Sequence, residues 1–189
     1  HQSVSSETVS PDAVSTSLLR PPAIIAAMRA NRDVAWRAQP LPPPPRSTSS
    51  LVELLEDLPD HAPEWWSESR AEYLLNQMSE RHRRIADELI GRDRVTYGTV
   101  FRRVRNGRSM AELRVDGVAG CLRTPKGGSG RQILFRAGRG AYAARLLTAR
   151  ECARLMGVPE LAISAPLNQA LFGLGDAVCV PVVEWIAKH

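Results

Sequence analysis

The segment from Arg123 to Gln132 has the sequence RTPKGGSGRQ, which combines three cationic side chains with three glycines and two hydroxyl groups. Glycine lets a backbone approach a ligand closely and present its N–H groups to an anion. Guanidinium groups bind phosphate oxygens or the edge of guanine, and a glutamine amide pairs with the edge of adenine. These residue types predict a DNA-contacting loop that consists of Arg123, Thr124, Lys126, Gly127, Gly128, Ser129, Arg131 and Gln132.

Two other interpretations exist for this segment. A nucleotide phosphate loop would carry a GK[ST] ending, which the segment lacks, and we reject that interpretation. A hairpin tip with no ligand is the second alternative, and it stays open at this point. If the segment does bind DNA, the residue types allow Arg123 and Arg131 to contact either phosphates or bases, and we expect Arg131 to be the more base-specific of the two.

The segment lies in a strongly basic part of the chain. Residues 94–145 include 12 Lys or Arg and two acidic residues, whereas the rest of the chain has 13 basic and 18 acidic residues. A basic block in an otherwise acidic chain favours a polyanion such as nucleic acid as the partner, although a solvated surface can have the same composition. Three of its cations, Arg102, Arg103 and Arg105, lie close together and join the candidate DNA-contacting residues.

Strand and turn patterns surround these residues. Alternating apolar residues predict strands, and an Asn-Gly pair between two strands is typical of a tight hairpin turn. Strands are predicted at residues 96–105, 110–115, 118–122 and 133–135, with turns at Asn106-Gly107, Asp116-Gly117 and Gly138-Arg139-Gly140. The candidate residues are therefore expected at the end of a hairpin and in a loop between strands.

Helices are expected before this β-rich region. A proline at the first helical position predicts a helix at residues 22–30, closed by Asn31. The prolines of residues 40–45 favour a stiff polyproline II spacer, and an SH3-type ligand is the alternative. Ser50 and Glu53 form a capping box for a short helix that Pro59 ends.

Residues 67–90 have helical periodicity, with Leu74, Met78, Ile85 and Leu89 near one stripe. Ser79 can cap a helix, and it is expected to divide this region into two helices.

The stretch from Arg145 to Glu160, RLLTARECARLMGVPE, carries a nearly complete set of helix signals. Thr148 and Glu151 form a capping box at its start. Gly157 can adopt the left-handed conformation that stops a helix, and Pro159 blocks any continuation. A helix is therefore predicted between these two boundaries.

This stretch resembles motif IX of the DNA cytosine-5 methyltransferases, which has an Arg, then Leu-Thr, Arg-Glu, Ala-Arg-Leu and a Gly-hydrophobic-Pro ending. The matching positions are Arg145, Leu147-Thr148, Arg150-Glu151, Ala153-Arg154-Leu155 and Gly157-Val158-Pro159. The C-terminal stretch NQALFGLGDAVCVPVVEWIA resembles motif X of the same family. The resemblance implies a target recognition domain before motif IX, and it implies a structural role for Arg145, Thr148, Arg150, Glu151 and Arg154.

The motif X stretch is expected to form a glycine-bearing loop at residues 172–176, followed by a helix with Val178, Val182, Trp185 and Ile186 on one side. Propensity places Pro181 in the first turn of this helix, but the family pattern favours a start near Ala177. The resemblance implies that Gly175, Asp176, Ala177 and Val178 line part of the pocket for S-adenosylmethionine. The family often has Asn where Asp176 stands.

Catalysis in this family requires a Pro-Cys nucleophile that attacks C6 of a flipped cytosine, a glutamate beside the ring nitrogen and a glycine loop for the cofactor. The three cysteines of this chain lie in GCLR, ECAR and VCVP, and no FxGxG or ENV-like stretch is present. We therefore expect no catalytic residue in this chain. The cysteines also lack a CxxC spacing, so no metal site is expected.

These patterns predict an α+β fold. It would consist of a small β-rich target recognition unit, flanking α-helices and a C-terminal helix that belongs to a Rossmann-like catalytic domain absent from the chain. The expected division is a tail and proline-rich linker with a short helix at residues 1–49, the DNA-binding domain at 50–144, and the motif IX and X segments at 145–189.

The resemblance implies the C-terminal part of a bacterial-type enzyme that transfers a methyl group from S-adenosylmethionine to C5 of cytosine, as in restriction-modification systems. The expected partners are double-stranded DNA, a catalytic domain of the same or a separate polypeptide, and a second copy through the apolar C-terminal helix. We expect a cytoplasmic, nucleoid-associated protein with no signal peptide, no apolar run of 18 residues and no membrane partner. Because the chain begins with His1, we also expect an excised piece. The alternative is a stand-alone DNA- or RNA-binding module, which should cover its C-terminal helix.

Overall fold

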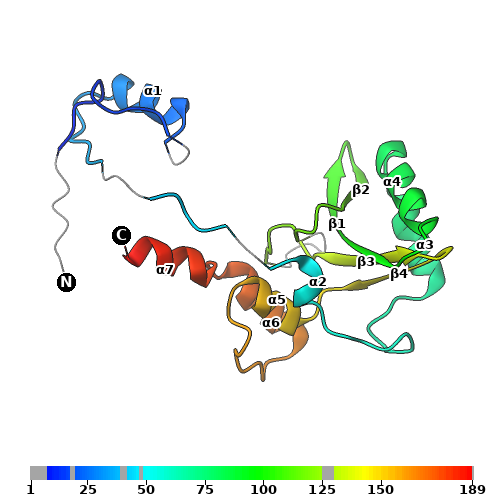
Figure 1. Ribbon diagram of the computed structural model, residues 1–189. Helices are drawn as coiled ribbons and strands as arrows, with labels where there is room; N and C mark the ends of the chain where they lie inside the picture. Colours follow the sequence, from blue (N-terminus) through cyan, green and yellow to red (C-terminus); the bar gives the residue numbers. More distant parts are fainter. Residues whose placement is uncertain (1–7, 18–19, 39–41, 47–48, 125–129, 189) are drawn as a thin grey trace. The chain divides into compact units, whose positions relative to one another are not determined.

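The computed structural model describes residues 8–17, 20–38, 42–46, 49–124 and 130–188 (Figure 1). The chain divides into two compact units, residues 1–46 and 47–188. In the first unit, helix α1 (Pro22–Ala30) starts at a proline and is closed by Asn31, as predicted. Its Ile25 and Met28 pack against Val14 and form a small core of their own.

The second unit is built on four antiparallel strands, β1 (Thr96–Arg105), β2 (Arg108–Arg114), β3 (Ile133–Gly138) and β4 (Ala141–Leu146). They form one sheet with the strand order β2-β1-β3-β4. The two-residue turn Asn106-Gly107 joins β1 to β2 in the first hairpin. Its residues have φ values of 50° and 74°, and such a turn requires positive φ values. Arg139 and Gly140, at 56° and 78°, close the second hairpin in the same way.

Helices cover both faces of this sheet (Figure 1). On one face, α3 (Glu68–Asn76) and α4 (Glu80–Ile90) pack against Ile133 and Phe135. On the other, α2 (Leu51–Leu54), α5 (Ala149–Leu155) and α6 (Leu167–Asp176) form a second core around Leu134. Successive side chains of a strand point to opposite faces, so β3 contributes to both cores.

The caps follow the sequence patterns closely. Capping boxes are present at Ser50 with Glu53 and at Thr148 with Glu151, and Ser79 caps α4. The short helix α2 ends at Leu54, earlier than the predicted end at Pro59. After α5, Gly157 has a φ of 78°, the left-handed conformation expected at the stop.

One predicted strand was wrong, and one strand was missed. Residues 118–122 form no strand, because side chains and not a neighbouring strand bind their carbonyl groups: the Thr99 hydroxyl donates to Val118 at 3.4 Å and the Gln132 amide donates to Cys121 at 3.3 Å. Strand β4 was missed, because Gly138-Arg139-Gly140 was taken for a turn leading to a helix, whereas it closes a hairpin.

The C-terminal stretch also differs from its prediction. Residues 172–176 belong to α6 and not to a loop, because burial of Leu171 and Leu174 offsets the cost of about 0.5–1 kcal/mol for each helical glycine. Helix α7 (Val180–Lys188) begins later than the predicted start near Ala177. Pro181 therefore lies in its first turn, where a missing N–H costs no helical hydrogen bond.

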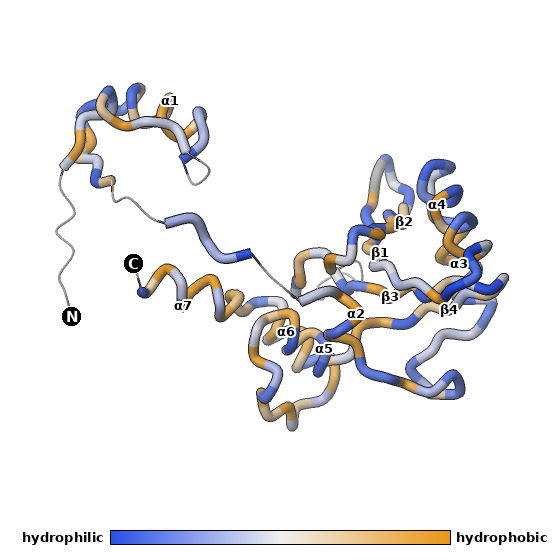
Figure 2. Tube along the Cα trace, in the orientation of Figure 1, coloured by the Kyte–Doolittle hydropathy of each residue, from blue (hydrophilic) through white to orange (hydrophobic). Residues whose placement is uncertain are grey.

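The stretch Leu167–Lys188 is long and apolar enough to cross a membrane by length and composition, and only 11% of its most apolar 18 residues are buried. Figure 2 shows how strongly apolar α7 is along this stretch. The sequence has no uninterrupted apolar run of this length, but its average hydropathy is high enough for a helix that crosses a membrane. The stretch is broken between α6 and α7, and α6 buries Leu171 and Leu174 in the second core. The absence of a membrane partner stays a prediction.

Candidate functional site

A polar cavity of about 570 Å³ lies between the end of β1 and the C-terminal end of α6. Three guanidinium groups and a single carboxylate line it, so its charge balance is positive. Segments that are far apart in the sequence assemble it, and its lining residues are Arg102, Arg103, Val104, Arg123, Thr124, Gly130, Gly175 and Asp176.

The arginines of this cavity are held to different degrees. The Nε atom of Arg103 lies 3.7 Å from Oε2 of Glu112, and its guanidinium carbon lies 4.8 Å from the centre of the Phe101 ring, so two strand neighbours orient this side chain. Arg123 is exposed, and none of the described carboxylates pairs with it. A guanidinium with free donors suits a phosphate ligand, because it presents paired N–H groups to two oxygens.

The structure brings together four of the predicted DNA-contacting residues, Arg102, Arg103, Arg123 and Thr124, around this one cavity. Five others cannot be placed. The side chain of Arg105 and the residues Lys126, Gly127, Gly128 and Ser129 lie outside the described part of the chain. The contact of all nine residues with DNA stays a prediction.

Arg131 and Gln132 do not line this cavity, although Gln132 lines an adjoining hollow of about 220 Å³ that shares Arg102, Arg103 and Arg123 with it. The Nη2 atom of Arg131 donates a hydrogen bond to Oδ1 of Asn168 on α6, and its Nε atom is buried without a partner among the described residues. Gln132 is only 7% exposed, and its amide donates to the carbonyl oxygen of Cys121 at 3.3 Å. A base contact would require either side chain to leave its position, so the geometry favours Arg123 over Arg131 as a DNA contact.

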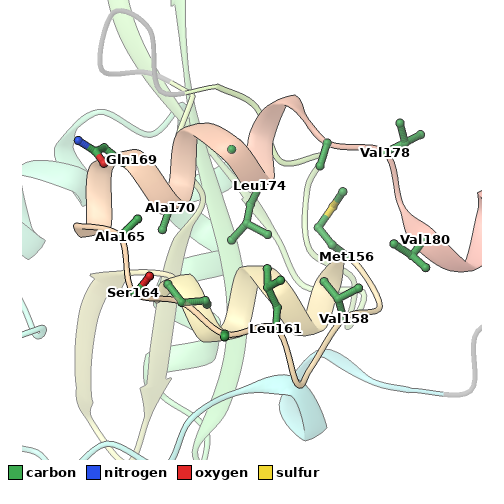
Figure 3. Close-up of a pocket in the computed structure, with 14 residues that line it drawn as sticks. Met156, Val158, Leu161, Ser164, Ala165, Gln169, Ala170, Leu174, Val178 and Val180 are labelled. Carbon is green, nitrogen blue, oxygen red and sulfur yellow. The ribbon is translucent and has the colours of Figure 1, made fainter.

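The four predicted cofactor residues are divided between two hollows. Gly175 and Asp176 line the polar cavity, whereas Ala177 and Val178 line an apolar pocket of about 320 Å³. Figure 3 shows this pocket between the end of α5, with Met156 and Val158, and the side chain of Leu174 on α6. A polar and an apolar hollow therefore meet at the end of α6.

A buried ion pair fixes the start of α5. Arg145 and Glu151 are each 1% exposed, and the Glu151 carboxylate accepts from Nη1 and Nη2 of Arg145 at 2.7 and 2.5 Å. The same carboxylate accepts from the backbone N–H of Thr148 at 2.8 Å and of Glu56 at 2.9 Å. The ring centre of Trp65 lies 5.1 Å from the guanidinium carbon of Arg145. The capping glutamate thus also links the α2 region to β4 and α5.

Two further motif IX arginines bind backbone carbonyls. Arg150 donates to two carbonyl oxygens of the chain that follows α5, at 2.6 and 2.8 Å. Arg154 donates to two carbonyl oxygens at the end of α2, at 3.0 and 3.1 Å. Because these guanidinium groups donate hydrogen bonds to the protein's own backbone, their geometry suits a role in positioning α5.

Cys152 lies on the buried face of α5. Burial, with a smaller effect from the charge of Glu151, raises the pKa of this thiol to about 12. Because only the thiolate is an effective nucleophile, we expect Cys152 to be almost entirely protonated and unreactive at pH 8. Cys121, in contrast, is exposed.

Thiol labelling tests this difference. With a disulfide reagent at pH 8, we expect Cys121 to react quickly in the native chain and Cys152 to react only after unfolding in urea. A Cys152→Ser variant identifies the slow thiol, since it should lose one thiol that reacts only in urea and none of those that react in the native chain. Rapid reaction of Cys152 in the native chain would contradict the burial described above.

Asn168 is a residue of this region that sequence reasoning missed. Its side chain holds Arg131, and it lies seven residues before Gly175 on α6. The spacing between Asn168 and Gly175 could have indicated this role, since residues seven apart share one face of a helix. It was overlooked because the stretch was assigned to the cofactor pocket and partly to a loop.

The positive charge balance of the cavity suits an anionic ligand. A sequence model of the family "C-5 cytosine-specific DNA methylase" matches residues 20–189. The chain belongs to this family, whose enzymes generally use S-adenosylmethionine. No curated protein and no solved structure matches the chain.

Proposed function

We propose that this chain is the DNA-recognition and C-terminal part of a DNA cytosine-5 methyltransferase that methylates C5 of cytosine in a specific sequence. The observation that carries the proposal is the positive cavity formed by Arg102, Arg103 and Arg123, in a chain that belongs to this family. Phosphates of double-stranded DNA would occupy it, because guanidinium groups release condensed counterions when they bind DNA. The target recognition domain would then include the sheet and the segment from Arg123 to Gln132.

The chain is proposed to be catalytically incomplete by itself. No proline precedes any of its three cysteines, and burial keeps Cys152 protonated. The nucleophile would come from an N-terminal catalytic domain with a Rossmann-like fold, in the same polypeptide or in a separate subunit. The exposed apolar residues of α7, Val182, Val183 and Ile186, support this, because such a domain would cover them.

This apolar helix also weighs against a stand-alone DNA- or RNA-binding module. Such a module should bury its own C-terminal helix, whereas α7 contributes no buried residue. When the catalytic domain is missing, a second copy of the chain would cover the apolar residues of α7 instead.

S-adenosylmethionine would be the methyl donor of the complete enzyme. Gly175 to Val178 would form one wall of its site, because Ala177 and Val178 line the apolar pocket and Asp176, the residue before them, carries a carboxylate. Ala177 and Val178 would contact the apolar part of the cofactor, and Asp176 would accept hydrogen bonds from its polar groups. The remaining walls would belong to the catalytic domain.

A complementation assay tests the proposal. We expect the purified chain alone to transfer no tritiated methyl group from S-adenosylmethionine to duplex DNA. A mixture with the N-terminal half of the enzyme should transfer it, and the matched control is that half with its Pro-Cys cysteine changed to serine. Methylation by the chain alone would refute its incompleteness, and an inactive mixture of two folded halves would refute the proposed complementarity.

A further inference from the structure

The backbone at Arg123-Thr124 lies directly against α6 at Gly175. A Cβ atom on Gly175 would lie 2.3 Å from the carbonyl carbon of Arg123, 2.4 Å from its oxygen and 2.5 Å from the backbone nitrogen of Thr124. These separations are far below van der Waals contact, and all three atoms are backbone atoms that cannot rotate away. Only glycine therefore allows this approach between α6 and the start of the glycine-rich segment.

The other end of the same segment is also attached to α6. Arg131 donates its Nη2 hydrogen to Oδ1 of Asn168, near the start of the helix. A Cβ atom on Gly130 would lie 2.7 Å from the carbonyl oxygen of Thr124, so the two ends of the segment also lie against each other. Both ends are thus fixed to one element and to one another.

The helix presents these two contacts on a single face. Asn168 and Gly175 are seven residues apart, which is about two turns and about 10 Å along the axis. Leu171 lies between them at the i+3 position and is buried in the core beneath the segment. The core therefore fixes the rotation of α6, and this rotation turns Asn168 and Gly175 towards the two ends of the segment.

We infer that α6 is the support that positions Arg123 for DNA binding, and that Gly175 and Asn168 are positioning residues for this contact. The inference rests on the proposed function, because it assumes that Arg123 binds DNA. It gives Gly175 a role beyond the cofactor wall, since the residue also sets the position of a DNA-binding side chain. The same helix would then join the cofactor wall to the DNA-binding cavity.

Two glycines of α6 provide a matched pair of variants. Gly175→Ala should displace the backbone of Arg123, whereas Gly173→Ala has no atom within 4 Å of the new methyl group. Binding of the full chain to a fluorescent DNA duplex of mixed sequence is measured by anisotropy at several salt concentrations. We expect Gly175→Ala and Arg123→Ala each to weaken binding about eightfold at 0.1 M salt and to reduce the salt slope by about 0.9. Gly173→Ala should bind as the wild type does.

The double variant separates positioning from a general loss of structure. If Gly175 acts through Arg123, Arg123→Ala with Gly175→Ala should bind no more weakly than either single variant. Additive losses would overturn the inference. If Arg123→Ala weakens binding and Gly175→Ala does not, the inference is again wrong while the proposed function stands. If Arg123→Ala has no effect, the proposed DNA contact itself fails.

Asn168 provides a second test, in case Gly175→Ala does not fold. Asn168→Ala removes the acceptor of Arg131 and should weaken DNA binding with the same reduced salt slope. Asn168→Asp keeps an oxygen at this position and should retain wild-type binding, because the aspartate can accept the same hydrogen bond. Equal binding by Asn168→Ala and the wild type would exclude Asn168 as a positioning residue.

Discussion

Replacing Glu151 by alanine is expected to lower the free energy of unfolding by about 3–5 kcal/mol, the usual cost of leaving one partner of a buried ion pair alone. The Glu151 carboxylate accepts four hydrogen bonds, and its removal leaves the Arg145 guanidinium buried without a counter-ion. It also leaves the backbone N–H groups of Thr148 and Glu56 without their acceptor. Urea denaturation followed by circular dichroism measures the loss as a lower midpoint at constant slope.

The matched control is Glu160→Ala, which removes an exposed carboxylate a few residues beyond α5. Its effect should stay within about 0.5 kcal/mol, as for most surface substitutions. A double variant adds a sharper test. Glu151→Leu with Arg145→Leu should lose less stability than the two single changes together, because no unpaired charge stays buried. A loss below about 1 kcal/mol for Glu151→Ala would show that water reaches this ion pair.

Glu151 also shows how far sequence reasoning reaches. Its cap was predictable, because Thr148 and Glu151 are three residues apart and a capping box depends only on local spacing. Its contact with Glu56 was not predictable, since 95 residues separate the two and only the tertiary fold brings them together. Local hydrogen bonds can be inferred from a sequence, whereas a buried network depends on how distant elements pack.

The β-sheet shows the same limit. The Asn106-Gly107 turn specified the first hairpin through φ angles that few other residue pairs adopt. The false strand at residues 118–122 has suitable composition, but composition does not reveal that the side chains of Thr99 and Gln132, and not a neighbouring strand, bind its carbonyl groups. The missed strand β4 is short, and its pairing with β3 follows from the turn at Arg139 and Gly140.

The candidate site was partly predictable for a related reason. Charge can be counted along a sequence, so the basic region and the involvement of Arg102, Arg103 and Arg123 could be proposed. The direction in which a side chain points cannot be inferred from such a count of charges. Arg131 and Gln132 have the residue types of DNA contacts, but only the structure shows that hydrogen bonds to Asn168 and to the carbonyl oxygen of Cys121 hold their side chains.

Replacing Arg102, Arg103 and Arg123 together by alanine is expected to abolish most DNA binding. If each guanidinium neutralises one phosphate, the slope of log affinity against log salt should fall by about 2.7, at about 0.9 for each contact. The plots of log affinity against log salt for the variant and the wild type should converge near 1 M salt. The variant should therefore bind about 500-fold more weakly at 0.1 M salt. Fluorescence anisotropy with a DNA duplex, repeated over a range of salt concentrations, measures both quantities.

A variant of equal charge provides the control for this last prediction. Arg81, Arg84 and Arg92 are exposed, lie on α4 or directly after it, and line no part of the cavity. Changing these three to alanine removes the same formal charge, so any loss of binding through net charge alone should be the same in both variants. We expect the control to lose no more than a few-fold in affinity and to keep a slope close to that of the wild type. Equal losses in the two triple variants would mean that DNA responds to the overall charge of the chain, and the cavity could then no longer be assigned as its binding site.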